Sequence, residues 1–415
     1  MTTSTTSTTR SVSAHDFNLP ASAPPAARAV FRLLKNISGG TLDMQLPDGS
    51  QVHFGQVADG GQRAALRLLS WDACSAALKR GDIGFAESYI AGHWTTPDLV
   101  ALLELFIANR DAIESVIYGT WWGGLAYRVK HLFNRNTRSG SAKNIHAHYD
   151  IGNTFYRLWL DETMNYSSAL FEGDLQRSTA HAQTAKVHRA LKECDVKPGD
   201  RVLEIGCGWG AVAEAATVDF GAQLTGVTLS SEQLAWAHER VAAKGQAANA
   251  DLRLQDYRDI QDEPFDAVIS IEMFEAVGRE YWASYFNTLR DKLKVGGRAC
   301  VQTITIRDDL FARYVKSTDF IQQYIFPGGL LPSPSAFRAE AAKAGLEVTN
   351  ELAFGTDYAH TLRRWRASFM GQDRQVRQLG FDTRFIRIWE FYLAYCEAAF
   401  ATGNTNVMQF TLRRA

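Results

Sequence analysis

The chain has 415 residues, of which 46% are hydrophobic and 21% are charged, and its formal net charge is −1. This length suits two domains with large cores, and the balanced charge argues against a dedicated nucleic-acid-binding protein. The five cysteines form no CxxC pair and no zinc-type spacing with histidine, which predicts a reducing, cytoplasmic environment and no metal site.

The N-terminal third begins with a Ser/Thr-rich stretch that lacks an apolar segment, so we expect a disordered tail rather than a secretory signal. The longest apolar run that follows, residues 100–108, is far too short to span a bilayer, so any membrane contact is expected to be peripheral. Helical patterns then flank the segment LDMQLPDGSQVHFG, in which Asp48-Gly49 is a strong hairpin signal. The pattern predicts a small α+β domain.

A polar segment with Gly and Ser in the middle of the chain is the best candidate for a linker. From residue 201 onward, short β-branched runs such as RVLEIG and FDAVISIE alternate with amphipathic helical patterns. This alternation predicts an α/β fold with a parallel, doubly wound, Rossmann-like sheet that binds its ligand at the carboxyl ends of the strands. The expected parts are a tail over residues 1–27, the small domain over 28–133, a linker over 134–145 and the larger domain over 146–415.

The stretch EIGCGWG, residues 204–210, follows a predicted strand and opens a predicted helix. Its glycines permit a tight turn and a close approach of a ligand to the backbone. A nicotinamide site would need an acidic residue at the end of the next strand, but residues 227–230 read VTLS. Instead, Glu204 precedes the glycines, as in the E/DxGxGxG pattern of class I S-adenosylmethionine methyltransferases. A glycine-rich turn without a ligand is the alternative.

Further blocks follow one another in a fixed order over residues 146–414. They are AHYDIGN, DETMNYSSALF, LEIGCGWG, GVTLSSEQ, IEMFEAVG, DFIQQYIFPGG, DYAHTLRRW and YLAYCEAAF. In content and order they resemble the cyclopropane-fatty-acyl-phospholipid synthase family, which includes the mycolic acid cyclopropane synthases. The hairpin LDMQLPDGS also resembles the N-terminal domain of the phospholipid-using branch. The resemblance therefore implies a lipid- or membrane-associating N-terminal domain and a catalytic methyltransferase domain.

The resemblance implies an S-adenosylmethionine pocket that is built from four segments. The residues assigned to it are Tyr166, Ser167, Glu204, Gly206, Gly208, Gly210, Thr228, Ser230, Gln233, Asp256 and Tyr257. Thr228, Ser230 and Gln233 would make the ribose contacts that a carboxylate makes elsewhere. Asp256 and Tyr257 would lie on the adenine side. Without the family, Thr228 and Ser230 would be interpreted as helix N-cap residues.

The family transfers the methyl group of S-adenosylmethionine to the cis double bond of an acyl chain in a phospholipid. The resemblance thus implies a carbocation, which needs apolar or aromatic walls and a base that removes a proton from the new methyl group. It further implies a bound bicarbonate as that base, held by Glu275, Tyr358 and the backbone of Ile304. The alternatives are a helix-start Glu275 that pairs with Arg279 and an ordinary core tyrosine at Tyr358.

Three positions bear on the outcome of this chemistry. Family members with the usual polar ring carry Cys where this chain has Ser168 and His where it has Gln302, and because neither Ser nor Gln is a base near neutral pH, an anion is favoured. Cys396 matches a cysteine regarded as an active-site residue of the family, but its aromatic helical context is equally typical of a structural residue. We expect cyclopropane formation, with methyl-branched or methylene products or a catalytically silent lipid-binding protein as alternatives.

Two segments are expected to meet the lipid. The insert TDFIQQYIFPGGLLPS, residues 318–333, suits an acyl-chain channel or plain core packing, and His148 and Tyr149 are expected in a flap over the pocket. Residues 115–149 contain no acidic residue, which predicts a surface for anionic headgroups or, alternatively, a solvated linker. The basic residues there are Arg128, Lys130, Arg135, Arg138 and Lys143. The expected partners are an unsaturated phospholipid in the membrane and a second copy of the chain, and no nucleic acid.

Overall fold

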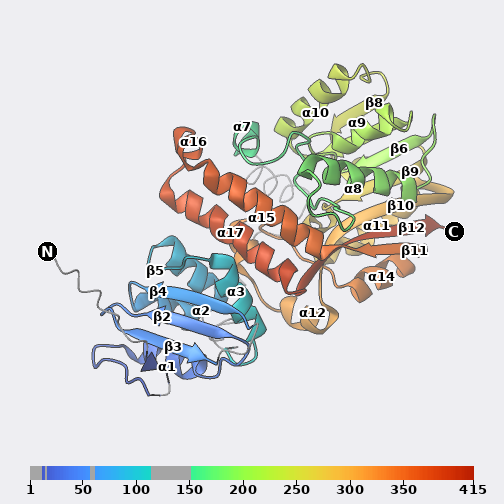
Figure 1. Cartoon of the computed structure of the whole chain (residues 1–415). Helices are drawn as coiled ribbons and strands as arrows, with labels where there is room; N and C mark the ends of the chain where they lie inside the picture. Colours follow the sequence, from blue (N-terminus) through green and yellow to red (C-terminus); the bar gives the residue numbers. More distant parts are fainter. Residues whose placement is uncertain (1–11, 15, 57–60, 114–150) are drawn as a thin grey trace. The chain divides into compact units, whose positions relative to one another are not determined.

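The computed structural model describes residues 12–14, 16–56, 61–113 and 151–415, which fall into two compact units (Figure 1). The first unit comprises Met1–Val129, Ser317–Phe320 and Asp382–Thr402. The second unit comprises Lys130–Lys316, Ile321–Phe381 and Gly403–Ala415. This division differs from the boundaries predicted from the sequence, which placed every residue from 146 onward in one domain.

The first unit contains a five-stranded sheet with the strand order β1-β3-β2-β4-β5. Its elements are β1 (Val12–Ser13), α1 (Pro25–Leu34), β2 (Thr41–Gln45), β3 (Gln51–Gly55), β4 (Arg63–Leu68), α2 (Asp72–Ile90), β5 (Trp94–Thr95), α3 (Leu99–Ala108) and α17 (Thr383–Ala401). Strands β2 and β3 are antiparallel, Gly49 adopts a φ of 88°, and Ser50 N donates to Asp48 Oδ1 at 2.9 Å. The hairpin predicted at Asp48-Gly49 is therefore confirmed.

Helix α17 belongs to the first unit because its apolar side packs against α2 and α3. Tyr89 Oη of α2 donates to Glu390 Oε2 at 2.6 Å, and the Tyr89 and Phe391 rings lie 5.8 Å apart. The helical period of this segment shows that one side must be buried, but it carries no information about which neighbour buries it. The sequence could therefore predict the helix without predicting its unit.

The second unit is built on a seven-stranded sheet with the order β11-β12-β10-β9-β6-β7-β8. Its strands are β6 (Arg201–Ile205), β7 (Gln223–Thr228), β8 (Ala250–Leu254), β9 (Phe265–Ile271), β10 (Leu293–Ile306), β11 (Leu346–Ala353) and β12 (Thr405–Arg414). The five strands from β10 to β8 are parallel, whereas β12 runs antiparallel to both β10 and β11. The predicted doubly wound, Rossmann-like sheet is confirmed.

Helices cover both faces of this sheet (Figure 1). The helices and 3-10 turns of the unit are α7 (Asn153–Tyr156), α8 (Thr179–Glu193), α9 (Ala211–Val218), α10 (Ser231–Ala243), η1 (Tyr257–Asp259), η2 (Phe274–Ala276), η3 (Arg279–Tyr281), α11 (Trp282–Lys292), α12 (Asp308–Tyr314), α13 (Phe320–Tyr324), α14 (Pro334–Lys343), α15 (Gly355–Gly371) and α16 (Asp373–Gln378). One apolar cluster joins α8, α9 and α10 to the strands, and another joins α11 and α14 to the other face. The strand order reverses at β6, so the crevice expected for a ligand lies outside the carboxyl ends of β6 and β9.

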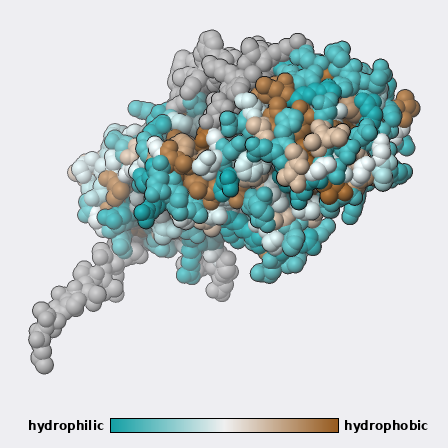
Figure 2. Space-filling model, turned by 90° about the horizontal axis from the view of Figure 1, so that it is seen from above, coloured by the Kyte–Doolittle hydropathy of each residue, from teal (hydrophilic) through white to brown (hydrophobic). Residues whose placement is uncertain are grey.

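The surface of the described residues mixes hydrophilic and hydrophobic side chains, and the face in Figure 2 shows both kinds interspersed. The large hydrophobic residues that are exposed lie on separate elements and are Leu69, Leu175, Val218, Leu254, Val295 and Leu379. Among the helices described, none combines the length and the apolar character that crossing a membrane requires.

Candidate active site

The glycine loop lies between β6 and α9, at the position where the strand order reverses. Gly206, Gly208 and Gly210 all have positive φ angles, of 87°, 49° and 80°. A Cβ atom on Gly210 would lie 2.9 Å from Ala237 Cβ, whereas one on Gly208 would meet nothing within 4 Å. Gly210 is thus required by packing against α10, while Gly208 leaves open space beside the backbone. This is the arrangement that a loop needs when a ligand approaches its main chain.

Glu204 lies in β6 just before this loop and is only 3% exposed. Its Oε2 atom is shielded from solvent and has no hydrogen-bond partner among the described residues. Burial raises the pKa of Glu204 to about 8, although Lys186 and Arg240 oppose the rise. A buried acceptor without a donor is costly, so the site fits a ligand that brings a cationic or hydrogen-bonding group to Glu204.

The end of β7 carries the three residues that were expected at the ribose. Ser230 Oγ accepts from Gln233 N at 3.3 Å and so caps α10, and Ser230 N donates to Thr228 Oγ1 at 3.2 Å. Thr228 Oγ1 also donates to Gln233 Oε1 at 3.3 Å. The N-cap interpretation is confirmed for Ser230, and the three buried side chains form one small network at the carboxyl end of the strand.

The residues expected at the adenine side follow β8. Asp256 is paired with Arg258, with 2.9 Å between Oδ1 and Nε and 2.5 Å between Oδ2 and Nη2. The Tyr257 ring lies 5.8 Å from that of Tyr285. The carboxylate of Asp256 is therefore already held by a guanidinium group, which fixes its position at this end of the sheet.

Tyr166 and Ser167 lie on the segment between α7 and α8, where an aromatic cluster and a buried lysine meet. The Tyr166 ring packs against Trp159 at 5.6 Å and Trp365 at 5.5 Å. Ser167 Oγ accepts from Lys186 Nζ at 2.6 Å. Burial lowers the pKa of Lys186 to about 8, and the negative charges of Glu272, Asp161 and Glu204 oppose that change.

Lys186 was missed by sequence reasoning. Its Nζ atom also donates to Asn165 Oδ1 at 3.2 Å, and the side chain is fully buried. A signal was available, because Lys186 falls on the apolar stripe of α8, between Ala182 and Ala190. Lysine in such a stripe usually has buried anionic or polar partners.

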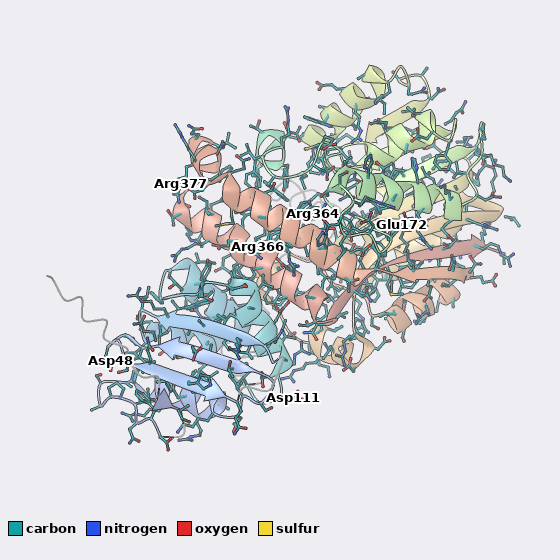
Figure 3. The ribbon with its side chains drawn as sticks, viewed as in Figure 1. Asp48, Asp111, Glu172, Arg364, Arg366 and Arg377 are labelled. Carbon is teal, nitrogen blue, oxygen red and sulfur yellow. The ribbon has the colours of Figure 1, made fainter. Side chains whose placement is uncertain are left out.

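The segment that carries Tyr166 to Ser168 is held in place by α15. Arg364 (Figure 3) donates through Nη1 to Arg177 O at 2.9 Å and through Nη2 to Leu175 O at 2.8 Å. Its guanidinium carbon lies 4.9 Å from the centre of the Phe171 ring. Asp357 of α15 also accepts from Phe171 N at 2.7 Å. These contacts fix the main chain next to Ser168 without using any group of the site itself.

Three donors converge on the carboxylate of Glu272, which directly follows β9. Ser168 N donates to Oε1 at 2.8 Å, Gln302 Nε2 donates to Oε1 at 2.7 Å, and Tyr358 Oη donates to Oε2 at 2.8 Å. Burial raises the pKa of Glu272, while these donors and the charge of Lys186 act against the rise. Sequence reasoning missed Glu272, although it brought the three donors together correctly.

Glu275 lies three residues further on, in η2, and accepts a hydrogen bond from Ile304 N. Glu275 and Ile304 were expected to hold an anion together, whereas the structure pairs them directly with each other, and Glu275 does not pair with Arg279 in the described part of the chain. Its Oε2 atom is shielded from solvent and has no hydrogen-bond partner among the described residues. Burial and the neighbouring charge of Glu272 raise the pKa of Glu275 to about 8. The site thus contains two adjacent carboxyl groups, and burial together with the charge of Glu272 favours the protonated form of Glu275.

The insert at residues 318–333 also contacts the backbone of Glu275. Leu330 N donates to Glu275 O at 2.8 Å, and Gln322 Nε2 donates to Gly329 O at 2.9 Å. Aromatic rings from η2, α11 and α14 pack behind Glu275, with Phe274 and Tyr285 only 4.8 Å apart. The carboxyl pair therefore has apolar and aromatic walls on the side of α11.

The remaining expected residues lie in the first unit or outside the described residues. Cys396 lies on α17 in the first unit, and burial together with the nearby charge of Asp319 raises the pKa of its thiol, which makes a thiolate unfavourable. His148, Tyr149 and the basic segment 115–149 lie outside the described residues. Among the residues described, no group of three or more His, Cys, Asp or Glu side chains could hold a metal ion.

The comparisons with known proteins agree with this geometry. Residues 136–410 match the mycolic acid cyclopropane synthetase family. The tuberculostearic acid methyltransferase UfaA1 of Mycobacterium tuberculosis is 38% identical over 343 residues, which cover 81% of this chain and 80% of that protein. The cyclopropane-fatty-acyl-phospholipid synthase of Escherichia coli K12 is 30% identical over 363 residues, which cover 87% of this chain and 90% of that protein.

A solved structure extends the likeness to three dimensions. Mycolic acid cyclopropane synthase CmaA1, complexed with SAH and CTAB, aligns with a TM-score of 0.62 at 32% identity and covers 66% of this chain and 98% of its own. The family resemblance seen in the sequence blocks is therefore confirmed. The chain belongs to the mycolic acid cyclopropane synthetase family of S-adenosylmethionine-dependent methyltransferases.

Proposed function

We propose that the protein transfers the methyl carbon of S-adenosylmethionine to the cis double bond of unsaturated acyl chains in phospholipids and forms cyclopropane fatty acids. The observation that carries the proposal is the pair of carboxyl groups, Glu272 and Glu275, set among aromatic walls in the same unit as the glycine loop. An alkene attacked by a methyl cation equivalent becomes a carbocation, which needs such walls and a base. The phospholipid substrate is supported by the 30% identity with the Escherichia coli synthase.

The residues of the pocket divide into two roles. The glycine loop, Glu204 and the Thr228–Gln233 network would hold S-adenosylmethionine, which supplies an electrophilic methyl group when it is bound. The aromatic residues exclude water, and the base that receives the proton from the new methyl group is located at the carboxyl pair. Tyr166, which packs against Trp365, would form part of the aromatic wall near the cofactor.

A methyl-branched or methylene product is the second candidate. It starts with the same methyl transfer, but a hydride shift moves the cationic carbon before the proton leaves. Proton loss then gives the methylene chain, and a saturated methyl branch forms only if a separate two-electron reductant acts on that methylene group afterwards. The 38% identity with a tuberculostearic acid methyltransferase favours it, as do Ser168 and Gln302 at positions where family members with the usual polar ring carry Cys and His. Both products need a base at the methyl carbon, so both use the same carboxyl pair.

Two species could be that base. One is a bicarbonate ion, as the family resemblance implies, held next to Glu275 and Ile304, where Glu275 Oε2 has no partner among the described residues. The other is the carboxylate of Glu272, which already occupies the donors of Ser168, Gln302 and Tyr358. The two bases predict different results when bicarbonate is removed from the buffer. Activity should fall if bicarbonate is the base and should persist if Glu272 is the base.

We also propose that the protein acts at the inner face of the membrane, in the cytoplasm, and forms a homodimer. The support for membrane contact is the sequence of residues 115–149, which contains basic and aromatic residues and no acidic one. Charge reversal at Arg128, Lys130 and Arg135 should reduce activity on anionic vesicles more than on detergent-dispersed lipid. Equal losses in both assays would contradict the proposal.

Lipid analysis by mass spectrometry tests the proposed function. The chain is expressed in a host without cyclopropane or branched acyl chains, and its phospholipids are compared with those of a host that carries the empty vector. We expect unsaturated chains to gain one CH₂ unit, as a ring that resists hydrogenation. A gain that hydrogenation reduces would identify the methylene product, and unchanged lipids would leave only a lipid-binding role.

Gly208→Val should abolish binding of S-adenosylmethionine, because the added side chain enters the open space beside the loop. Calorimetry on the purified protein measures the affinity. Gly245→Val is the matched control, since Gly245 also has a positive φ, of 70°, and open space, but follows the far end of α10. Unchanged affinity in folded Gly208→Val would overturn the assignment of this loop.

A further inference from the structure

The donors expected around an added anion are already satisfied by a side chain of this protein. All three groups that reach Glu272 come from different parts of the second unit: Ser168 from the segment before α8, Gln302 from β10 and Tyr358 from α15. Between them they engage both carboxylate oxygens. Several donors that point at one place form an anion-binding site, and here the carboxylate of Glu272 occupies that site.

The orientation of the Gln302 amide is fixed by two consecutive hydrogen bonds that reach it from α8 through β12, the strand that pairs with β10. Arg189 Nη1 donates to Gln409 Oε1 at 2.6 Å, and Gln409 Nε2 donates to Gln302 Oε1 at 2.9 Å. Since the oxygen of Gln302 is used in this way, its NH₂ group must face Glu272. A histidine at this position could itself accept a proton. The amide of Gln302 is not a base, and its NH₂ group can only donate a hydrogen bond to the carboxylate of Glu272.

The backbone of Glu272 is held in an unfavourable conformation. Its φ is 48°, in the left-handed region that residues other than glycine rarely adopt. Strain of this kind persists where the surrounding structure enforces it, and it is concentrated at functional sites. Here it turns the side chain at the end of β9 toward the three donors.

The second carboxyl group completes the arrangement. Ile304 N donates to Glu275, whose protonated form is favoured by burial beside the charge of Glu272, whereas Glu272 has three donors and the nearby ammonium group of Lys186. The negative charge of the pair is therefore placed on Glu272. Of the two carboxyl groups, Glu272 is the one that can accept a proton.

We propose that Glu272 is the catalytic base of this protein and takes the place of an added bicarbonate ion. The inference rests on the proposed function. One C–H bond of the transferred methyl group breaks, its electron pair forms the ring bond to the cationic carbon, and the proton goes to a carboxylate oxygen of Glu272. If a hydride shift comes first, the same electron pair forms a methylene double bond instead. Neither path needs an oxidant or a reductant.

Binding of ¹³C-bicarbonate, followed by NMR on the purified protein, tests the proposal without the lipid reaction. We expect no site-specific binding to the wild type, because Glu272 fills the ring. Glu272→Gly should bind it, because the donors of Ser168, Gln302 and Tyr358 are then free and glycine accepts the positive φ. Glu172→Gly is the matched control: Glu172 (Figure 3) also has a positive φ, of 54°, but is a surface residue paired with Arg177. Bicarbonate held by the wild type at this ring would overturn the proposal.

Turnover provides the second arm. In buffer freed of carbon dioxide the wild type should keep its rate, while Glu272→Gln should lose about 100-fold or more with its affinity for S-adenosylmethionine unchanged. Added bicarbonate should restore Glu272→Gly more than Glu272→Gln, whose amide still fills the ring. A wild type that needs bicarbonate, or an active Glu272→Gln, would show that the base is elsewhere. If no lipid is methylated by the wild type, the proposed function fails, and the NMR arm still decides whether Glu272 fills the ring.

Discussion

Lys186→Met should lower the free energy of unfolding of the second unit by about 3–5 kcal/mol at pH 7. The Nζ atom is fully buried, donates to Asn165 and Ser167, and lies near the carboxyl groups of Glu204 and Glu272. Methionine fills a similar volume but leaves the two acceptors without a donor and the carboxyl groups without a nearby cation. Breaking a buried charge network by removing one partner is among the most destabilising single changes.

Hydrogen exchange of the amides in α8, measured with and without urea, reports this loss for the second unit. Lys192→Met is the control, because Lys192 lies on the exposed side of the same helix. That change should stay within about 0.5 kcal/mol of the wild type. Equal, small effects of both substitutions would mean that Lys186 stabilises nothing beyond its packing.

The parts of the site that local patterns determine could be predicted from the sequence. The spacing of Gly206, Gly208 and Gly210 specifies a turn between a strand and a helix, and Ser230 followed by Gln233 specifies a helix cap. These features depend on residues that are close together in the chain. The structure shows the turn between β6 and α9 and the cap of Ser230 on α10.

Glu272 could not be assigned in the same way, because its role depends on the pairing of distant segments. The parallel register of β9 and β10 places Gln302 opposite Ile271, and Glu272 N donates to Gln302 O at 2.8 Å. Tyr358 reaches the same carboxylate from α15. The sequence block IEMFEAVG contains two glutamates, and periodicity alone does not distinguish the one that receives three donors from the one that receives Ile304 N.

Cys396 shows that a match to a family position does not reveal which unit carries the residue. Helix α17, which carries it, packs with α2 and α3 in the first unit. An apolar stripe predicts that a helix is buried, but the surface that buries it follows from the complete fold. A residue match to a family therefore identifies a chemical group but does not place it in space. Its position follows only when the tertiary contacts of the helix or strand that carries it are known.

Glu275→Gln should make the protein more stable at pH 9 and leave its stability at pH 5 almost unchanged. The pKa of Glu275 is raised from an ordinary value of 4.5 to about 8 by burial and by the charge of Glu272. A carboxyl group with a raised pKa in the folded state costs nothing below the unfolded pKa. The cost grows as the pH rises from about 4.5 to about 8, because folding then opposes ionisation.

The amide keeps an oxygen that can accept from Ile304 N and never ionises, so it removes this cost. Each tenfold change in an ionisation constant corresponds to about 1.4 kcal/mol, so with allowance for the partial exposure of Glu275 the gain at pH 9 should be on the order of 2–3 kcal/mol. Urea unfolding of both proteins at the two pH values measures it. Glu280→Gln, at an exposed position in η3, should show no such dependence. If Glu275→Gln instead lost stability at pH 9, Glu275 would be an ionised partner in the site, and the proton of the carboxyl pair would have to be placed on Glu272.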